Sequence, residues 1–245
     1  AGDGGAVSRP TPSTTPGVDL YGDLTARMVE AETAVFVFSG TGGGQTMSGS
    51  GEMRFTTAGY DADVRLTMPQ SGQVRAVLAP TASYLALPAA KGLPKSRPWV
   101  RVTSAPTTQV GRELVPVVDQ LRASFDPAQS LGLLRFGGRV AEAGPAMVEG
   151  VSTTHYRASV SLRKATTHAA GAVQAQYQSM LDAGATRLEV EVWVDTTGLP
   201  RRFQVGLPTA QGVFSLTGIY RQWGSPVKVA APKPKQVFDS NSLKG

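Results

Sequence analysis

The chain has 245 residues, and only His155 and His168 among them are histidines, while cysteine is absent. His155 stands beside Tyr156 and Arg157 in an alternating stretch, with no serine or carboxylate at a spacing that would pair with it locally. Without cysteine there can be no disulfide, no thiolate metal site and no cysteine nucleophile. We therefore predict neither a catalytic centre nor a metal site.

Carboxylates, the other candidates for acid–base chemistry, share one face of an alternating stretch in two places. Asp61 and Asp63 fall on one side of an alternating stretch, and Glu189, Glu191 and Asp195 do so in another. Alternation puts each set on the wet face of a strand, where solvated charges are more common than catalytic pairs. The sequence also lacks the Gly-x-Ser-x-Gly motif of serine hydrolases. We expect a protein that is not an enzyme and needs no cofactor.

The charge balance is basic, with 24 Lys and Arg against 18 Asp and Glu, for a net charge of +6. Such a surplus can attract nucleic acid or an anionic membrane surface. The basic residues are dispersed, however, with local pairs only at Arg163-Lys164 and Arg201-Arg202, so nucleic acid is not an expected partner. The glycine run at 40–44 has no P-loop lysine after it and indicates a hairpin turn.

Short alternating runs dominate the chain and predict antiparallel strands. Residues 60–68 place Val64, Leu66 and Met68 on an apolar face, and residues 151–162 and 187–195 alternate in the same way. The polar breaks between the early runs are too short for βαβ crossovers. No apolar run approaches the roughly 18 residues of a membrane-spanning helix.

Four stretches have helical periodicity instead: 19–32, 113–125, 126–135 and 166–183. Asp19 is the expected N-cap of the first. The second should begin near Val115, because Pro116 suits a first turn. Asp126 and Pro127 have the residue types of an N-cap and first helical position, and Gly184 is suited to end the fourth helix.

The composition suggests three segments. Residues 1–18 contain mostly Gly, Ala, Ser, Thr and Pro and are expected to form a disordered tether, residues 19–238 a single domain, and residues 239–245 a tail. The tether is either leftover expression sequence or the linker of a lipoprotein whose acylated cysteine lies just upstream. We favour the linker, and we expect a monomer.

Three motifs, GVSTTHYR at 150–157, VWVDTTGLPRR at 192–202 and YRQWGSPV at 220–227, resemble stretches of the LppX/LprG family of actinobacterial lipoproteins. The resemblance extends from about Leu20 to Pro232. It implies a LolA-like α+β fold, in which helices cover the concave side of a curved antiparallel half-barrel sheet. It also implies transport of acylated lipids or glycolipids by an exported protein, anchored to the outer face of the cytoplasmic membrane through an N-terminal lipidated cysteine. Similar folds serve as envelope sensors that regulate membrane partners, which is the alternative function.

A sheet with one apolar face must bury that face, either in a packed core or around a cavity. Aromatic residues make up only 7% of the chain, and the apolar faces consist mostly of medium-sized aliphatic residues, which favours a cavity for acyl chains. We expect the mid-chain helices to act as its lid. The expected lining, inferred from which way each residue faces, is Val64, Leu66, Met68, Leu114, Val118, Leu121, Phe125 and Leu134.

Overall fold

The computed structural model describes residues 14–42, 45–68, 72–79, 81–86, 96–136, 139–209 and 212–242. Within these residues, thirteen strands form one sheet. The strands are β1 (Thr14–Pro16), β2 (Thr33–Gly42), β3 (Gln45–Thr56), β4 (Gly59–Met68), β5 (Gly72–Leu78), β6 (Ser83–Ala86), β7 (Trp99–Val102), β8 (Arg139–Val148), β9 (Val151–Ser161), β10 (Arg187–Asp195), β11 (Pro200–Thr209), β12 (Gly212–Arg221) and β13 (Val237–Asp239). The helices are α1 (Gly17–Ala31), α2 (Gln109–Phe125), α3 (Pro127–Gly132), α4 (Leu162–His168) and α5 (Gly171–Asp182), with short 3-10 helices η1 (Leu133–Phe136), η2 (Pro234–Gln236) and η3 (Ser240–Ser242).

The sheet consists of two runs of sequential strands, β8 to β12 and β2 to β7, joined where β12 pairs with β2. Strands β1 and β13 occupy its two edges, so the sheet is open. Every pair is antiparallel except β13 with β7, which is parallel. The predicted antiparallel connectivity is therefore confirmed.

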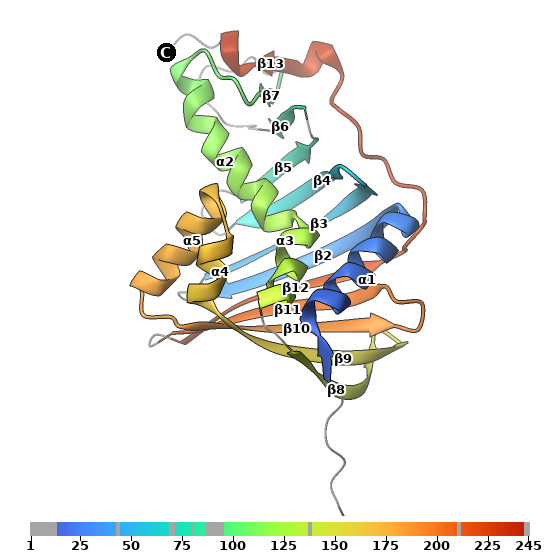
Figure 1. The fold of residues 1–245 in the computed structure, drawn as a ribbon. Coiled ribbons are helices and arrows are strands. Elements are labelled where there is room, and N and C mark those ends of the chain that lie inside the picture. Colours follow the sequence, from blue (N-terminus) through green and yellow to red (C-terminus); the bar gives the residue numbers. More distant parts are fainter. Residues whose placement is uncertain are drawn as a thin grey trace, which may run out of the picture.

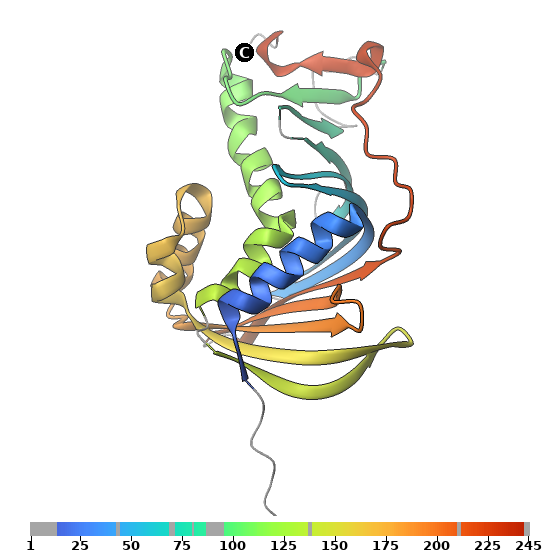
Figure 2. The ribbon, with the colours of Figure 1, turned by 45° about the vertical axis from the view of Figure 1, so that its right-hand side comes forward.

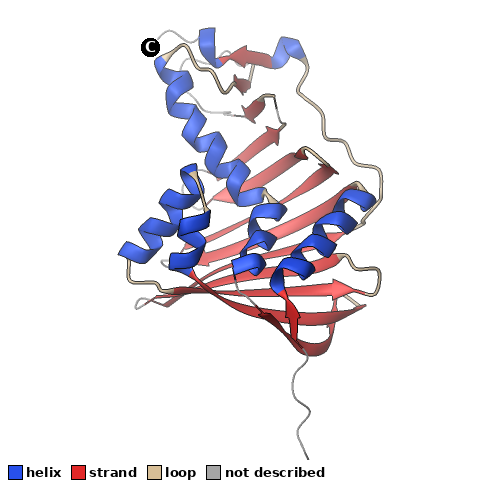
Figure 3. Cartoon of the chain, in the orientation of Figure 1, coloured by secondary structure: helices blue, strands red, loops and turns tan. Residues whose placement is uncertain are grey.

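The sheet curves, and its helices lie on the concave side (Figures 1 and 2). Figure 3 shows the same division by colour, with helices in front of a layer of strands. Helices α4 and α5 lie at one end of the strands, whereas α1, α2 and α3 cross the concave face. This is the predicted α+β half-barrel with covering helices.

The first ordered strand begins earlier than the composition suggested. Residues 14–16 of the expected 1–18 tether form β1 and pair with residues 139–141 of β8. Composition gives no sign of this strand, because backbone pairing needs no apolar side chains. Without β1, β8 would present an unpaired edge. The rest of the expected tether, residues 1–13, lies outside the described residues.

Helix α1 also begins before the expected position, at Gly17, so Asp19 is not its N-cap. Asp19 lies in the first turn, where a negative charge interacts favourably with the helix dipole. The helical periodicity predicted for residues 19–32 is confirmed, since its recurring apolar residues Leu20, Leu24 and Met28 lie on one side and are 7%, 1% and 3% exposed.

Helix α2 contains Pro116 in its interior instead of starting near Val115. The start lies at Gln109, because the Thr108 side chain accepts a hydrogen bond from the Gly111 N–H and caps an earlier turn. The proline removes one helical N–H and crowds the preceding turn, which the exposed side of the helix tolerates. By contrast, Asp126 and Pro127 cap and open α3 as predicted.

The helical stretch expected at 166–183 is two helices. Ser161 caps an earlier start by accepting a hydrogen bond from the Lys164 N–H, and Gly171 takes a left-handed φ of +58° at the break. Gly184, with a φ of +86°, follows the second helix as predicted.

Part of the expected tail at 239–245 is packed against the body. The Thr108 hydroxyl donates to the Ser240 carbonyl at 2.7 Å, and the side-chain oxygen of Asn241 accepts from the Thr107 N–H at 2.8 Å. These bonds join polar residues far apart in the sequence, so hydrophobic periodicity gives no sign of them.

Two glycines of β3 make room for two phenylalanine rings on the concave face. Phe36 and Phe38 of β2 stand directly opposite Gly51 and Gly49. A Cβ atom added at Gly51 would lie 2.6 Å from Cε1 of Phe36 and 2.6 Å from the backbone carbonyl oxygen of Asp63 on β4. The rings therefore lie across the neighbouring strand and form part of the floor beneath the helices.

We predict that Gly51→Ala destabilises the protein by about 1–3 kcal/mol, because the added methyl group overpacks the site of Phe36. The control is Gly22→Ala in α1, where an added Cβ has no heavy atom within 4 Å. Removing a glycine from a helix interior should stabilise by about 0.5–1 kcal/mol. Urea unfolding measures both, and a Gly51→Ala variant as stable as the parent would show that this contact does not constrain the ring.

Candidate functional site

The space between the concave face and the helices is one continuous apolar cluster. Of the expected lining, Val64 and Leu66 on β4 are 0% and 2% exposed, and Val118 on α2 is 4% exposed. Leu134, in η1, is also fully buried. The structure thus brings these residues of the sheet and the covering helices into a single cluster.

Three further expected residues, Leu114, Leu121 and Phe125 on α2, are only partly buried and pack against that cluster. The side chain of Met68, the last residue of β4, lies outside the described part of the structure. Within α2 only Gly111 and Val118 are buried. Helix α2 therefore covers the sheet less completely than α1, in which Leu20, Leu24 and Met28 are buried.

Aromatic rings line the middle of this interior. The Phe125 ring of α2 meets Phe38 edge-on, with centroids 4.8 Å apart, and lies 5.9 Å from Phe36. Tyr220 of β12 contacts Phe36 on one side and stacks on Trp223 on the other. Helix α2 thus contacts the floor at the strand pair that joins the two halves of the sheet.

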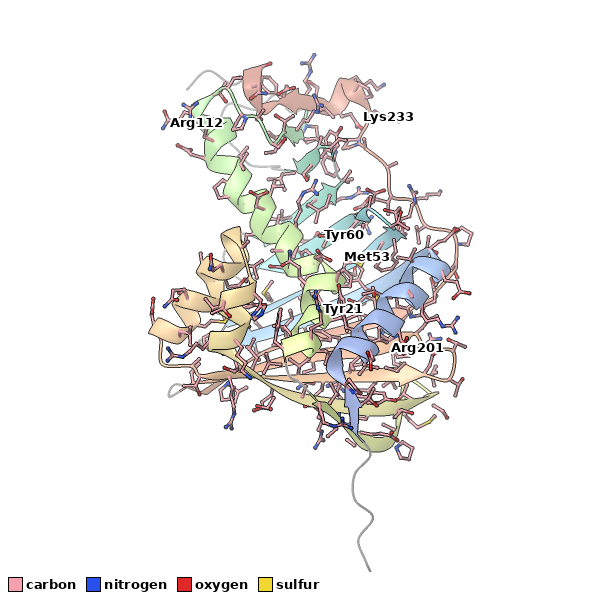
Figure 4. The ribbon with its side chains drawn as sticks, viewed as in Figure 1. Tyr21, Met53, Tyr60, Arg112, Arg201 and Lys233 are labelled. Atoms are coloured by element: carbon pink, nitrogen blue, oxygen red, sulfur yellow. The ribbon has the colours of Figure 1, made fainter. Side chains whose placement is uncertain are left out.

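A small polar latch holds the C-terminal half of α2 to the sheet. The Tyr60 hydroxyl of β4 donates to the Arg122 carbonyl at 2.6 Å (Tyr60 is labelled in Figure 4). The Arg122 guanidinium donates to the Ser83 hydroxyl, at 3.0 and 3.2 Å, and to the Ala79 carbonyl. We call Tyr60, Ala79, Ser83 and Arg122 the α2 latch.

Burial shapes the ionisation of the groups near the latch. It raises the pKa of the Tyr60 hydroxyl above its ordinary value, and the nearby Asp126 carboxyl raises it further. Burial also raises the pKa of Asp126 itself, against the N–H groups of Ala128 and Gln129 that lower it. A deprotonated Tyr60 is therefore disfavoured in the folded protein.

An open groove of about 530 Å³ lies between α2 and α5. Its walls are Pro116, Asp119 and Gln120 from α2, and Ala175, Gln176, Ser179 and Met180 from α5. Met180 also packs against the central cluster, so one wall of the groove borders the apolar interior.

His155 has a carboxylate partner that local spacing could not reveal. Its Nε2 lies 2.7 Å from Glu191 on the adjacent strand, and its ring stacks on Trp193 with centroids 4.2 Å apart. Arg202 lies over the same indole ring. Burial lowers the pKa of His155, although Glu191 acts in the opposite direction. This cluster is on the convex face, because the alternate residues Tyr156 and Ala158 belong to the apolar interior.

Within the described residues, no three His, Asp or Glu side chains converge as a metal site would require. None of the helices in the described part of the chain is long and apolar enough to cross a membrane.

Sequence reasoning missed Tyr60 and Arg122 as functional candidates. In the sequence Tyr60 is simply the first residue of an alternating stretch, and Arg122 is a polar residue of a predicted helix. Their contact joins positions 62 residues apart. A signal was present in the polar Arg122 next to the apolar Leu121, but spacing alone does not identify the partner.

Two solved structures resemble this fold over most of its length. Mycobacterium tuberculosis lipoprotein LppX matches with a TM-score of 0.51 and 15% identity, over 87% of this chain and 99% of LppX. LprF from Mycobacterium bovis matches with a TM-score of 0.53 and 11% identity, over 89% of this chain and 99% of LprF. No protein-family model and no curated protein sequence matches the chain. The resemblance seen in the motifs is therefore confirmed at the level of the fold.

We predict that Tyr60→Phe loosens α2 specifically. Loss of the hydrogen bond to Arg122 should lower the free energy of unfolding by about 1 kcal/mol. Amide exchange should accelerate in α2 but not in β10, whose apolar residues are buried in the sheet. The matched control is Tyr177→Phe in α5, whose hydroxyl makes no hydrogen bond to another described residue. Equal effects of both variants on α2 exchange would contradict the latch.

The raised pKa of Tyr60 predicts a loss of stability at alkaline pH. Because the folded-state pKa lies above the unfolded value of about 10, the stabilisation is complete below about pH 10 and is lost as pH rises above it. The free energy of unfolding, measured with denaturant from neutral to strongly alkaline pH, should fall less steeply for Tyr60→Phe than for the parent. Parallel curves would show that Tyr60 titrates equally in both states.

Proposed function

We propose that this chain is a lipid-binding or lipoglycan-binding lipoprotein of the bacterial cell envelope, not an enzyme. In this proposal the protein is exported and attached through an N-terminal lipid anchor to the outer face of the cytoplasmic membrane. It works as a monomer and holds acyl chains between the concave face and α2. The observation that carries the proposal is the single apolar cluster formed by the sheet and the covering helices. The fold shared with LppX, a lipoprotein, supports it.

The energetics of α2 favour exchange of its contacts for those of an acyl chain. The latch consists of a few hydrogen bonds, each of which contributes about 1 kcal/mol net. A buried acyl chain gains about 0.8 kcal/mol for each methylene, so a chain of ordinary length can offset both the latch and the partly buried side chains of α2. Binding therefore requires α2 to move away from β2 and β4 while the sheet stays folded.

The location of the polar groups supports binding over catalysis. The His155–Glu191 pair lies on the convex face, on the opposite side of the sheet from the apolar cluster. Asp126 borders the interior, but its carboxylate accepts a hydrogen bond from the Ala128 N–H and so caps α3. The proposed ligand is thus held mainly by apolar burial.

The direct test is native mass spectrometry of the purified protein, together with organic extraction. The proposal expects co-purified acyl lipid, and its release should shift the protein mass by that of the extracted species. Protein that is repeatedly empty and takes up no added acyl lipid would refute the carrier function and favour the sensor alternative.

We predict that Leu121→Asp abolishes lipid retention. Leu121 packs against the apolar cluster, and an unpaired charge there costs several kcal/mol, equivalent to at least about a hundredfold weaker binding. Titration with a fluorescent acyl lipid measures the change.

The matched control is Val117→Asp, the same substitution on the same helix at a side chain that is 48% exposed. It should bind lipid like the parent. If Leu121→Asp also binds like the parent, α2 does not line the binding site.

A further inference from the structure

The two ends of the strands differ in chemistry. At the end where β10 turns into β11, Arg201 and Asp195 form an ion pair of 2.6 Å. At the same end Arg221 of β12 pairs with Glu149 in the turn between β8 and β9. This end of the sheet is charged and internally paired.

The opposite end exposes apolar side chains on neighbouring strands. Met47 near the start of β3 is 37% exposed, and Val213 and Phe214 at the start of β12 are 62% and 40% exposed. Strand β2 lies between β12 and β3, and its Gly40 pairs with Leu216 on one side and with Met47 on the other. We call Met47, Val213 and Phe214 the apolar margin.

An apolar track leads inward from Met47 and Phe214 along the concave face, whereas Val213, the neighbour of Phe214 on β12, points to the convex face. On β3 the same face continues from Met47 to Met53, which is 1% exposed. On β2 it continues from Gly40 to Phe38 and Phe36, which are 7% and 4% exposed. The margin is therefore continuous with the interior in which an acyl chain would lie.

Two cationic side chains lie at the same end of the strands as the margin. Helix α4 begins directly after β9 at this end of the sheet and presents exposed Arg163 and Lys164 (Figure 1). Within the described residues, neither side chain has an ion-pair partner. Exposed apolar side chains and unpaired cations at the same end of the sheet match an anionic lipid surface, which accepts both kinds of group.

We propose that the apolar margin docks onto an anionic phospholipid membrane, so that a lipid enters the interior along the track without crossing water. This proposal rests on the lipid-binding function and adds the surface through which it operates. A stable protein partner would need about 800 Å² of complementary surface, whereas three side chains at the ends of strands suit shallow insertion into a bilayer.

The test measures co-sedimentation of the 245-residue chain with vesicles of phosphatidylcholine and phosphatidylglycerol. The double variant Met47→Gln/Phe214→Gln removes apolar character without adding charge, and it should bind at least about tenfold more weakly. The control is Met147→Gln on β8, where the methionine is 64% exposed but far from the margin. It should bind like the parent.

Charge is tested separately. Arg163→Gln and Lys164→Gln should each weaken binding about fivefold, and vesicles of phosphatidylcholine alone should bind far less. Unchanged melting temperatures would establish that all variants are folded. Equal binding by the parent and the double variant would overturn the proposal, as would a dimer in light scattering that the double variant dissociates.

Binding of a monomeric fluorescent acyl lipid by the same variants separates this proposal from the function on which it rests. Retained lipid binding with lost vesicle binding supports docking at the margin. Failure of the parent to bind monomeric lipid refutes the lipid-binding function. If the parent binds monomeric lipid but does not co-sediment with vesicles, only the docking surface is refuted.

Discussion

The need to cover one apolar face of a very wide sheet governs the arrangement of this molecule. A sheet of thirteen strands has more concave surface than a single helix can bury, so several helices from different parts of the chain share the task. They do so unequally. Helix α1 buries Leu20, Leu24 and Met28, whereas α2 leaves Leu114, Leu121 and Phe125 partly exposed and adds a polar contact to β4 through Tyr60 and Arg122. Helix α1 is therefore the firmer wall of the interior, and α2 is the weaker one.

Where function is concerned, this inequality matters more than any single residue. A binding protein for long apolar ligands must keep the interior dry when it is empty and still admit a chain many atoms long. The floor of Phe36 and Phe38 is set by the strands, because the rings lie over glycines of the next strand. The cover formed by α2 is joined to the sheet by few hydrogen bonds, and the lipid binding that we propose would exchange its contacts for those of an acyl chain. Rigidity and access are thus assigned to different elements.

Local patterns predicted much of this architecture. Alternation identified β4 and the apolar facing of Val64 and Leu66, and the Asp126-Pro127 pair identified the start of α3. The sequence did not predict particular contacts between residues far apart in the chain. β1 exists because β8 offers an edge, and the Tyr60–Arg122 bond joins elements whose sequences carry no mark of each other. The face on which each side chain lies could be inferred from the sequence. The exposure of a side chain and its contacts depend on the assembled sheet.

The pairing of β12 with β2 has a consequence for how the molecule assembles. It is the seam that unites the two runs of strands, and its Thr41–Ser215 contact spans 174 positions of the chain. Each run pairs strands that follow one another in the sequence, with α4 and α5 between β9 and β10, whereas the seam must close a loop that contains most of the protein. Such closure is slow compared with hairpin formation. Until that pairing forms, the facing edges of β12 and β2 are unpaired and open to other chains.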